Sequence, residues 1–166
     1  MSRYKSLWLA LLLCLCAAAA ASAGAASEQE MLRIHDLYNE QLLNNRQFDL
    51  ADEIFHPDLV RHAPGEPDVV GPDALVATMQ PFIAAFPDLQ WTIEDRFVAG
   101  SRLALRWVAR GTHTGDFMGL PPTGNEVVVA GNAIHRFRDG KIVESWDVFD
   151  ALGMMIQVGA IPMPGQ

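Results

Sequence analysis

The sequence predicts an α+β fold in which N-terminal helices and a strongly curved antiparallel sheet enclose a cone-shaped pocket. Apolar residues recur every three or four positions in the first half of the chain, as on one face of a helix. From Leu89 onward they alternate with polar residues, as in strands with one buried face. Helices followed by a run of strands are typical of α+β proteins. Helices that close one side of a bent sheet leave a hollow suited to a small molecule.

Residues 1–23 have the pattern of a secretory signal peptide. Arg3 and Lys5 precede an apolar run and an Ala-Ser-Ala cleavage pattern. The alternative is a retained membrane anchor, but the run is shorter than the roughly 20 apolar residues that a spanning helix needs. Both cysteines, Cys14 and Cys16, lie in this segment, so the mature chain would have no disulfide and no thiolate nucleophile. We expect a secreted or periplasmic protein whose residues 27–166 form one domain.

The mature chain is acidic. Two of the 12 basic residues lie in the signal segment, so 10 remain against 20 acidic residues and the formal charge is −10. Nucleic acids and anionic membrane surfaces are therefore poor partners.

The helices are predicted from caps and periodicity. Ser27 and Glu30 fit a capping box, and Asp49 fits the cap of a short second helix. The third helix contains Pro81, which should kink or shorten it. On these signals we expect helices over residues 27–44, 49–55, 71–86 and 151–158, with an extended segment over residues 59–64.

Two long hairpins are predicted in the second half of the chain. The strands of the first cover residues 89–98 and 102–110, and those of the second cover residues 126–138 and 141–149. The second hairpin turns at Asp139-Gly140, a pair of residues strongly favoured in two-residue turns.

Five strings along the mature chain resemble those of the SnoaL-like polyketide cyclases, a family with the nuclear-transport-factor-two-like, or cystatin-like, fold. They are FHPD, AFPDL, GTHTGDFMGLPPTG, RFRDGKI and WDVFDALGMMIQVGAIP. The resemblance implies an ester cyclase or polyketide cyclase, usually dimeric or tetrameric, with no metal and no organic cofactor. Its reaction would be an intramolecular aldol ring closure in which an aspartate removes a proton beside a carbonyl. The aligned D-G-K-I turn puts this aspartate at Asp147 and puts Ala133 where the family has a pocket histidine.

Asp147 shares a predicted strand face with Val143, Ser145 and Phe149. An aspartate there would lose hydration, which favours a role as general base. The alternative is a buried aspartate that backbone amides satisfy. In an ideal two-residue hairpin its neighbour is Asn132, which would bind the carboxylate or a substrate oxygen, whereas one bulge would move the neighbour to Ala133.

Two other carboxylates lie close to Asp147. Asp150 precedes the last helix and has the position of an N-cap. Glu144 would lie opposite His135 in the ideal register, where a surface cross-strand pair and a pocket role are both open.

Three histidines are candidates for the missing imidazole. His62 would lie at the pocket mouth, His113 lies in the loop 111–124, and His135 lies on a central strand. Each is a candidate catalytic or substrate-binding residue, although a single histidine is more often structural. No close metal-ligand spacing occurs, so we expect no metal site.

Four apolar side chains are candidates for the wall or lid of the pocket. Trp91 and Trp107 lie on strands, where ordinary core packing is the alternative. Phe117 and Met118 lie in a Gly/Pro-rich loop, where apolar residues often form a lid or a subunit contact.

The sequence thus predicts a cofactor-independent acid–base enzyme that acts on a small apolar carbonyl compound or ester. A hydrolase or isomerase on the same scaffold, or an exported small-ligand-binding protein, are the alternatives. We also expect a homodimer through the outer sheet face, with Trp146 and Ala133 supplying apolar surface.

Overall fold

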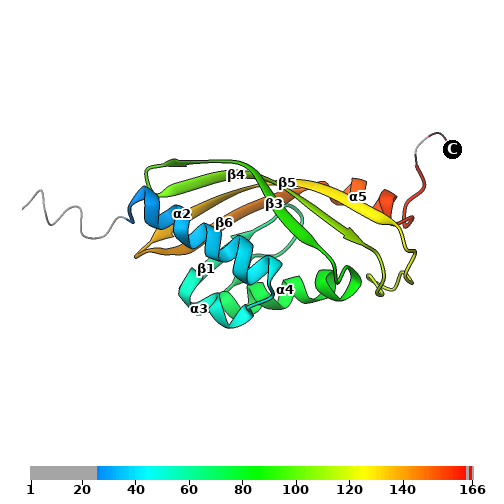
Figure 1. Ribbon diagram of the computed structural model, residues 1–166, viewed down its shortest axis with the longest axis horizontal. Coiled ribbons are helices and arrows are strands. Elements are labelled where there is room, and N and C mark those ends of the chain that lie inside the picture. Colours follow the sequence, from blue (N-terminus) through cyan, green and yellow to red (C-terminus); the bar gives the residue numbers. More distant parts are fainter. Residues whose placement is uncertain (1–25, 164, 166) are drawn as a thin grey trace, which may run out of the picture.

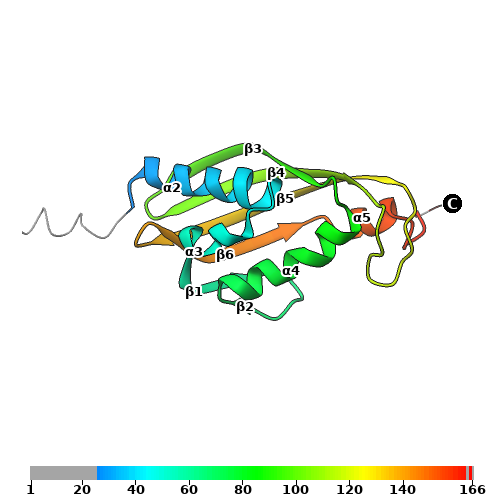
Figure 2. The same cartoon turned by 60° about the horizontal axis from the view of Figure 1, so that its bottom comes forward.

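The computed structural model describes residues 26–163 and 165. It has a curved, open sheet of six strands, with helices packed against one face (Figure 1). Figure 2 shows three of these helices across that face, and a fourth at the opposite end of the molecule from the start of the described chain. In order they are α2 (Glu28–Asp36), α3 (Ala51–Ile54), α4 (Pro72–Ala85) and, at the far end, α5 (Ala151–Gln157). The predicted α+β class is confirmed. The predicted signal peptide lies outside the described residues.

The helix ends follow the predicted caps with one exception. Ser27 accepts a hydrogen bond from the Glu30 amide at 3.2 Å, and Asp150 accepts one from the Gly153 amide at 2.8 Å. The prediction for Asp49 is wrong, because it lies inside a 3-10 turn, η2 (Phe48–Leu50), and caps nothing. Pro81 does not shorten α4, which continues to Ala85.

Helix α2 continues directly into a π-helix, η1 (Leu37–Asn44). Such wide turns are rare and occur frequently at functional sites. Together α2 and η1 direct His35, Tyr38, Asn39 and Leu43 toward the inner face of the sheet. The first predicted helix therefore has the expected length, but its second half is wider than an α-helix.

The sheet is mixed, whereas the sequence suggested an antiparallel one. Its strand order is β2-β1-β6-β5-β4-β3, and all neighbours are antiparallel except β1 and β6, which are parallel. The strands are β1 (Phe55–His62), β2 (Val69–Val70), β3 (Gln90–Ala99), β4 (Arg102–Thr112), β5 (Glu126–Arg138) and β6 (Lys141–Phe149).

The β5–β6 hairpin turns at Asp139 and Gly140, which both have positive φ, as this turn type requires. Its register shifts between Arg136 and Phe137, because Arg136 pairs with Glu144 but Phe137 pairs with Ile142. Val143 is thus an extra residue on β6. This bulge decides which side chains of β6 face the helices.

The apolar core has two parts that border one cavity. One part joins α2, η1 and α3 to the sheet, and the other lies near α5. None of the helices in the described residues has the length and apolarity needed to span a membrane.

Candidate active site

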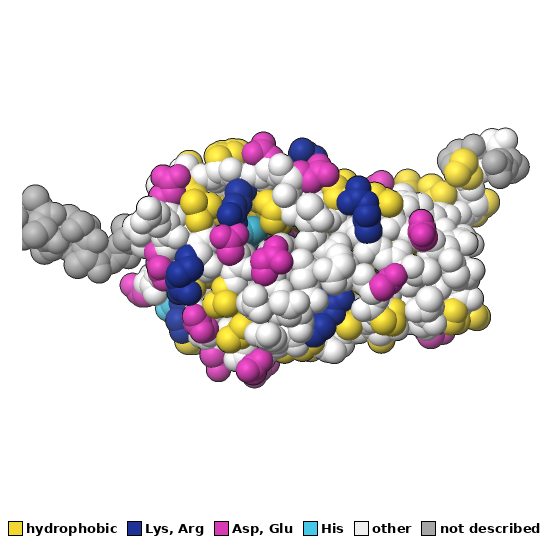
Figure 3. Space-filling model, viewed as in Figure 1, with side chains coloured by type: hydrophobic (Ala, Val, Ile, Leu, Met, Phe, Trp, Pro, Cys, Tyr) yellow, Lys and Arg dark blue, Asp and Glu magenta, His cyan; other side chains and the backbone are white. Residues whose placement is uncertain are grey.

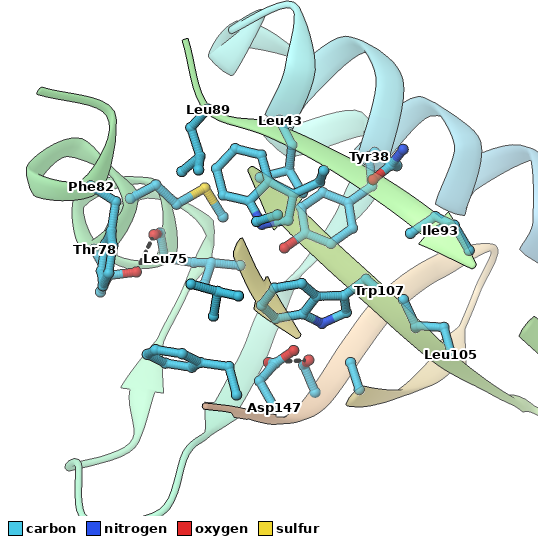
Figure 4. Close-up of a pocket in the computed structure, with 18 of the residues that line it drawn as sticks. Tyr38, Leu43, Leu75, Thr78, Phe82, Leu89, Ile93, Leu105, Trp107 and Asp147 are labelled. Carbon is cyan, nitrogen blue, oxygen red and sulfur yellow. Dashed lines mark hydrogen bonds between the residues drawn. The ribbon is translucent and has the colours of Figure 1, made fainter. Parts of the chain in front are cut away.

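A cavity of about 170 Å³ lies between the inner face of the sheet and the helices. Most of its lining is apolar, and Figure 4 shows this wall with Asp147 at one side. Its polar side chains are His35, Tyr38, Asn39, Arg61, Thr78, His135, Ser145 and Asp147. Three predicted pocket residues, Trp91, Trp107 and His135, line it.

Asp147 reaches the cavity because of the bulge at Val143. The shifted register pairs Asp147 with Ala133, as the bulged alternative predicted, and Ala133 is buried on the inner face. Its Oδ2 accepts a hydrogen bond from Ser145 Oγ at 2.6 Å and lies 3.5 Å from Arg61 Nε. Its side chain is 22% exposed, so a ligand can reach the carboxylate. Among the described residues no donor bonds its Oδ1.

Ser145 links Asp147 to His135. Its Oγ lies 3.0 Å from His135 Nδ1, and both residues are buried. A hydroxyl has one proton, which Ser145 gives to Asp147, so Nδ1 of His135 must donate to Ser145. The bonds therefore run in one direction, from imidazole to hydroxyl to carboxylate. His135, two residues beyond Ala133, thus lies near Asp147 and contacts it through Ser145.

His35 and His135 form a buried pair whose ring centroids are 5.6 Å apart. Burial, the neighbouring His135 and Arg96 lower the pKa of His35 to about 3. Burial also lowers the pKa of His135, although the charge of Asp147 acts in the opposite direction. Both imidazoles are therefore neutral near pH 7.

Tyr38 contributes a phenol to the same cavity. Figure 4 shows its hydroxyl pointing inward, and no side chain of the described residues forms a hydrogen bond with it. Burial, together with the charge of Asp147, raises the pKa of Tyr38 well above its usual value. The phenol thus keeps its proton and is a free hydrogen-bond donor. In the sequence Tyr38 belongs to an apolar helix stripe, which gave no sign of this role.

Trp107 lies flat against the sheet because residue 131 is glycine. A Cβ placed on Gly131 would lie 2.2 Å from the Trp107 ring, so any side chain there would displace the indole. The paired row Trp107, Gly131 and Phe149 therefore brings two aromatic rings to the cavity beside Asp147.

Two predicted catalytic residues lie on the other face of the sheet. Asn132 is exposed and pairs with Val148, so it does not contact Asp147. His62 bonds Asp68 at 2.8 Å and Glu144 at 3.1 Å and stacks on Trp146. The residue of β1 that lines the cavity is its neighbour Arg61.

Glu144 belongs to this outer network. It pairs with Arg136, not with His135 as the ideal register predicted, and its carboxylate binds the Arg136 guanidinium at 2.6 Å. Of the two roles left open for Glu144, the structure therefore has the surface cross-strand pair.

The predicted site residues of the loop 111–124 pack within the protein or face solvent, and they do not line the cavity. His113 is completely buried, bonds Thr123 Oγ1 at 3.0 Å and packs on Phe86. Phe117 is also buried and packs on the same ring. Met118 is 82% exposed. None of these three predicted site residues lines the cavity.

Charges on the helix-covered side are mixed. Figure 3 shows acidic side chains spread over this side with basic ones among them. Within the described residues, no group of three or more His, Cys, Asp or Glu side chains is arranged to hold a metal ion.

The fold and cavity define a class: an α+β protein with a curved open sheet and a mostly apolar pocket for a small molecule. The family model of the SnoaL-like polyketide cyclases matches residues 33–158. The chain therefore belongs to this family. A comparison with curated protein sequences found no match.

Three solved structures show how widely this fold is shared. IdmH from Streptomyces antibioticus, described as a candidate polyketide cyclase, is 34% identical, with a TM-score of 0.69 over 80% of this chain and 99% of its own. AclR from Streptomyces galilaeus, described as a candidate hydroxylase, is 31% identical, with a TM-score of 0.73 over 82% and 85%. A SnoaL-like protein from Jannaschia sp. CCS1 is 21% identical, with a TM-score of 0.74 over 82% and 98%.

Proposed function

We propose that this protein is a cofactor-independent enzyme that removes a proton from the carbon next to a carbonyl group. The observation that carries the proposal is the state of Asp147. Ser145 and Arg61 hold its Oδ2, while its Oδ1 has no donor among the described residues. A fixed carboxylate with one free oxygen beside a cavity is suited to general-base catalysis.

In the proposed step Asp147 Oδ1 takes the proton, and the electron pair of the broken C–H bond moves onto the carbonyl oxygen. Tyr38 would donate its O–H to that developing oxyanion, a contribution that is often large in such reactions. The enolate would then attack a second carbonyl of the same molecule and close a ring, and the new alkoxide would take the proton back from Asp147. Alternatively, the enolate would take that proton at another carbon. Either route regenerates the carboxylate. His135 and Ser145 act as positioning residues for the base.

The arrangement favours catalysis over ligand storage. Asp147 is bound by side chains rather than by backbone amides. A second polar group, the Tyr38 hydroxyl, points into the same space. Converging polar groups of complementary roles are expected of an active site.

The test is deuterium exchange at the carbon beside the carbonyl, followed by NMR in D₂O with a panel of simple ketones. Asp147→Asn should lower the catalysed exchange by roughly 10²–10⁴-fold, and Tyr38→Phe by roughly 10²–10³-fold. Asp150→Asn is the matched control, because it makes the same chemical change at a helix cap outside the cavity and asparagine is also a good cap. Thermal melts check that each variant folds. Full exchange activity in Asp147→Asn would refute the role of the base.

We further propose that two copies associate through the outer face of the sheet. An apolar row crosses this face through Phe97, Ala104, Ile134 and Trp146, which are paired across four strands. Phe97 and Ile134 are exposed large apolar side chains, which are more often found at contacts than on free surfaces. Ala133, which the sequence suggested for this contact, faces the cavity instead. Export through residues 1–23 would place the enzyme in the periplasm or outside the cell.

A further inference from the structure

The volume of the cavity limits the size of the substrate, which membership of the family leaves open. A cavity of 150 Å³ lined by apolar side chains holds one benzene molecule, and this one measures about 170 Å³. One ring with a short substituent fills such a space. A molecule of three or four fused rings exceeds it.

Large side chains on both walls keep the cavity small. Trp91, Trp107 and Phe149 occupy the sheet side, while Met79 and Phe82 extend from α4. Gly131 lets the Trp107 ring lie flat against β5, so this wall is broad and aromatic. A flat ring packs on such a wall better than a flexible chain does, because aromatic faces stack with favourable contact.

The charges around the cavity favour a neutral ligand. His35 and His135 are neutral, since burial lowers the pKa of both. The Arg61 guanidinium is shared between Asp147 at 3.5 Å and Glu66 at 2.9 Å. The single positive charge of Arg61 is therefore already shared by two carboxylates. A ligand carboxylate in the cavity would be repelled by Asp147, and this repulsion is strong where the dielectric constant is low.

We propose that the site takes an uncharged carbonyl compound with a single ring, held with its ring against Trp107 and its carbonyl group toward Tyr38. The assignment of the carbonyl rests on the proposed function, whereas the limits on size and charge rest on the cavity alone. The substrate class is thus a neutral cyclic or ring-substituted ketone or ester, not a free acid and not a multi-ring compound.

Isothermal titration calorimetry with four probes tests this class. Acetophenone is neutral with one ring, benzoate is anionic with one ring, and 2-acetylnaphthalene and 9-acetylanthracene are neutral with two and three rings. We expect acetophenone to bind at one site and benzoate to bind at least roughly tenfold more weakly, in line with the size of single-group discrimination. Acetylanthracene should not bind.

A variant that enlarges the cavity gives a gain of binding. Met79→Ala should strengthen the binding of 2-acetylnaphthalene by roughly tenfold or more, because it removes bulk from the helix wall. Met118→Ala is the matched control, since it makes the same change at an exposed residue outside the lining and should leave all four affinities unchanged.

Three results would overturn the proposal. The first is that acetylanthracene or benzoate binds as tightly as acetophenone, and the second is that acetophenone does not bind. The third is that Met79→Ala, shown by thermal melts to be folded, has an unchanged affinity for 2-acetylnaphthalene. The measurement is independent of turnover. Acetophenone binding without Asp147-dependent deuterium exchange would refute the proposed function and leave the ligand class standing. Deuterium exchange that occurs only with multi-ring ketones would refute the ligand class and leave the proposed function standing.

Discussion

The burial of His35 predicts a specific loss of stability in acid. In the unfolded chain this histidine takes up a proton as the pH falls through 6.5, but in the folded protein its pKa is about 3. Between these values the unfolded state binds more protons, so the free energy of unfolding decreases as the pH falls. The contacts agree, because Arg96 Nη1 lies 3.1 Å from His35 Nδ1 and would face any proton placed there.

The size of the effect follows from the two pKa values. One proton bound only by the unfolded state changes the free energy of unfolding by about 1.4 kcal/mol per pH unit. Because titration near pH 6.5 is gradual, His35 alone should lower it by about 2 kcal/mol between about pH 7.5 and pH 5. His135 acts in the same direction, since burial lowers its pKa as well.

His35→Leu tests this reasoning, because leucine fills similar space and cannot be protonated. Urea unfolding, followed by tryptophan fluorescence at several pH values, should show that the variant loses about 2 kcal/mol less than the wild type over this range. His62→Gln is the control with the opposite sign. Hydrogen bonds to Asp68 and Glu144 raise the pKa of His62, so its contribution is present in acid and is lost as the pH rises. Equal acid sensitivity of wild type and His35→Leu would refute the argument.

Three further predictions concern the cap, the assembly and the leader. Asp150→Ala should cost about 1 kcal/mol of stability through the lost cap and leave turnover per folded molecule nearly unchanged; a silenced but stable variant would contradict this. Ile134→Asp should convert the proposed dimer to monomers in light scattering, and a wild type that is monomeric at micromolar concentration would rule the dimer out. Exported protein should begin near residue 24 on N-terminal sequencing, whereas an intact Met1 would overturn the signal peptide.

The features that the sequence predicted correctly have local causes. The Ser27 and Asp150 caps, the Asp139-Gly140 turn and the alternation of β3 and β4 each depend on residues a few positions apart. The same holds for Trp91 and Trp107, whose alternation with polar neighbours indicated an inward face.

The features that could not be predicted from the sequence depend on packing between distant segments. The parallel pairing of β1 with β6 and the irregular start of that pairing decide that Arg61 faces inward and His62 outward. No pattern near residue 61 signals this choice. Asn132 was misplaced because the ideal hairpin register ignores the bulge at Val143, although the bulged alternative gave the correct partner for Asp147.

The bulge at Val143 gives β6 one residue more than a regular two-residue hairpin needs. If the same chain paired without the bulge, Asp147 would lie opposite Asn132 and its side chain would face solvent, because side chains on a strand alternate between faces. Removal of Val143 would instead leave a regular hairpin in which Asp147 keeps Ala133 as its partner and still faces the cavity. The bulge and the extra residue therefore compensate each other. A related hairpin that is one residue shorter and has no bulge should present the same aspartate to the cavity, so a difference in hairpin length does not by itself indicate a change of activity.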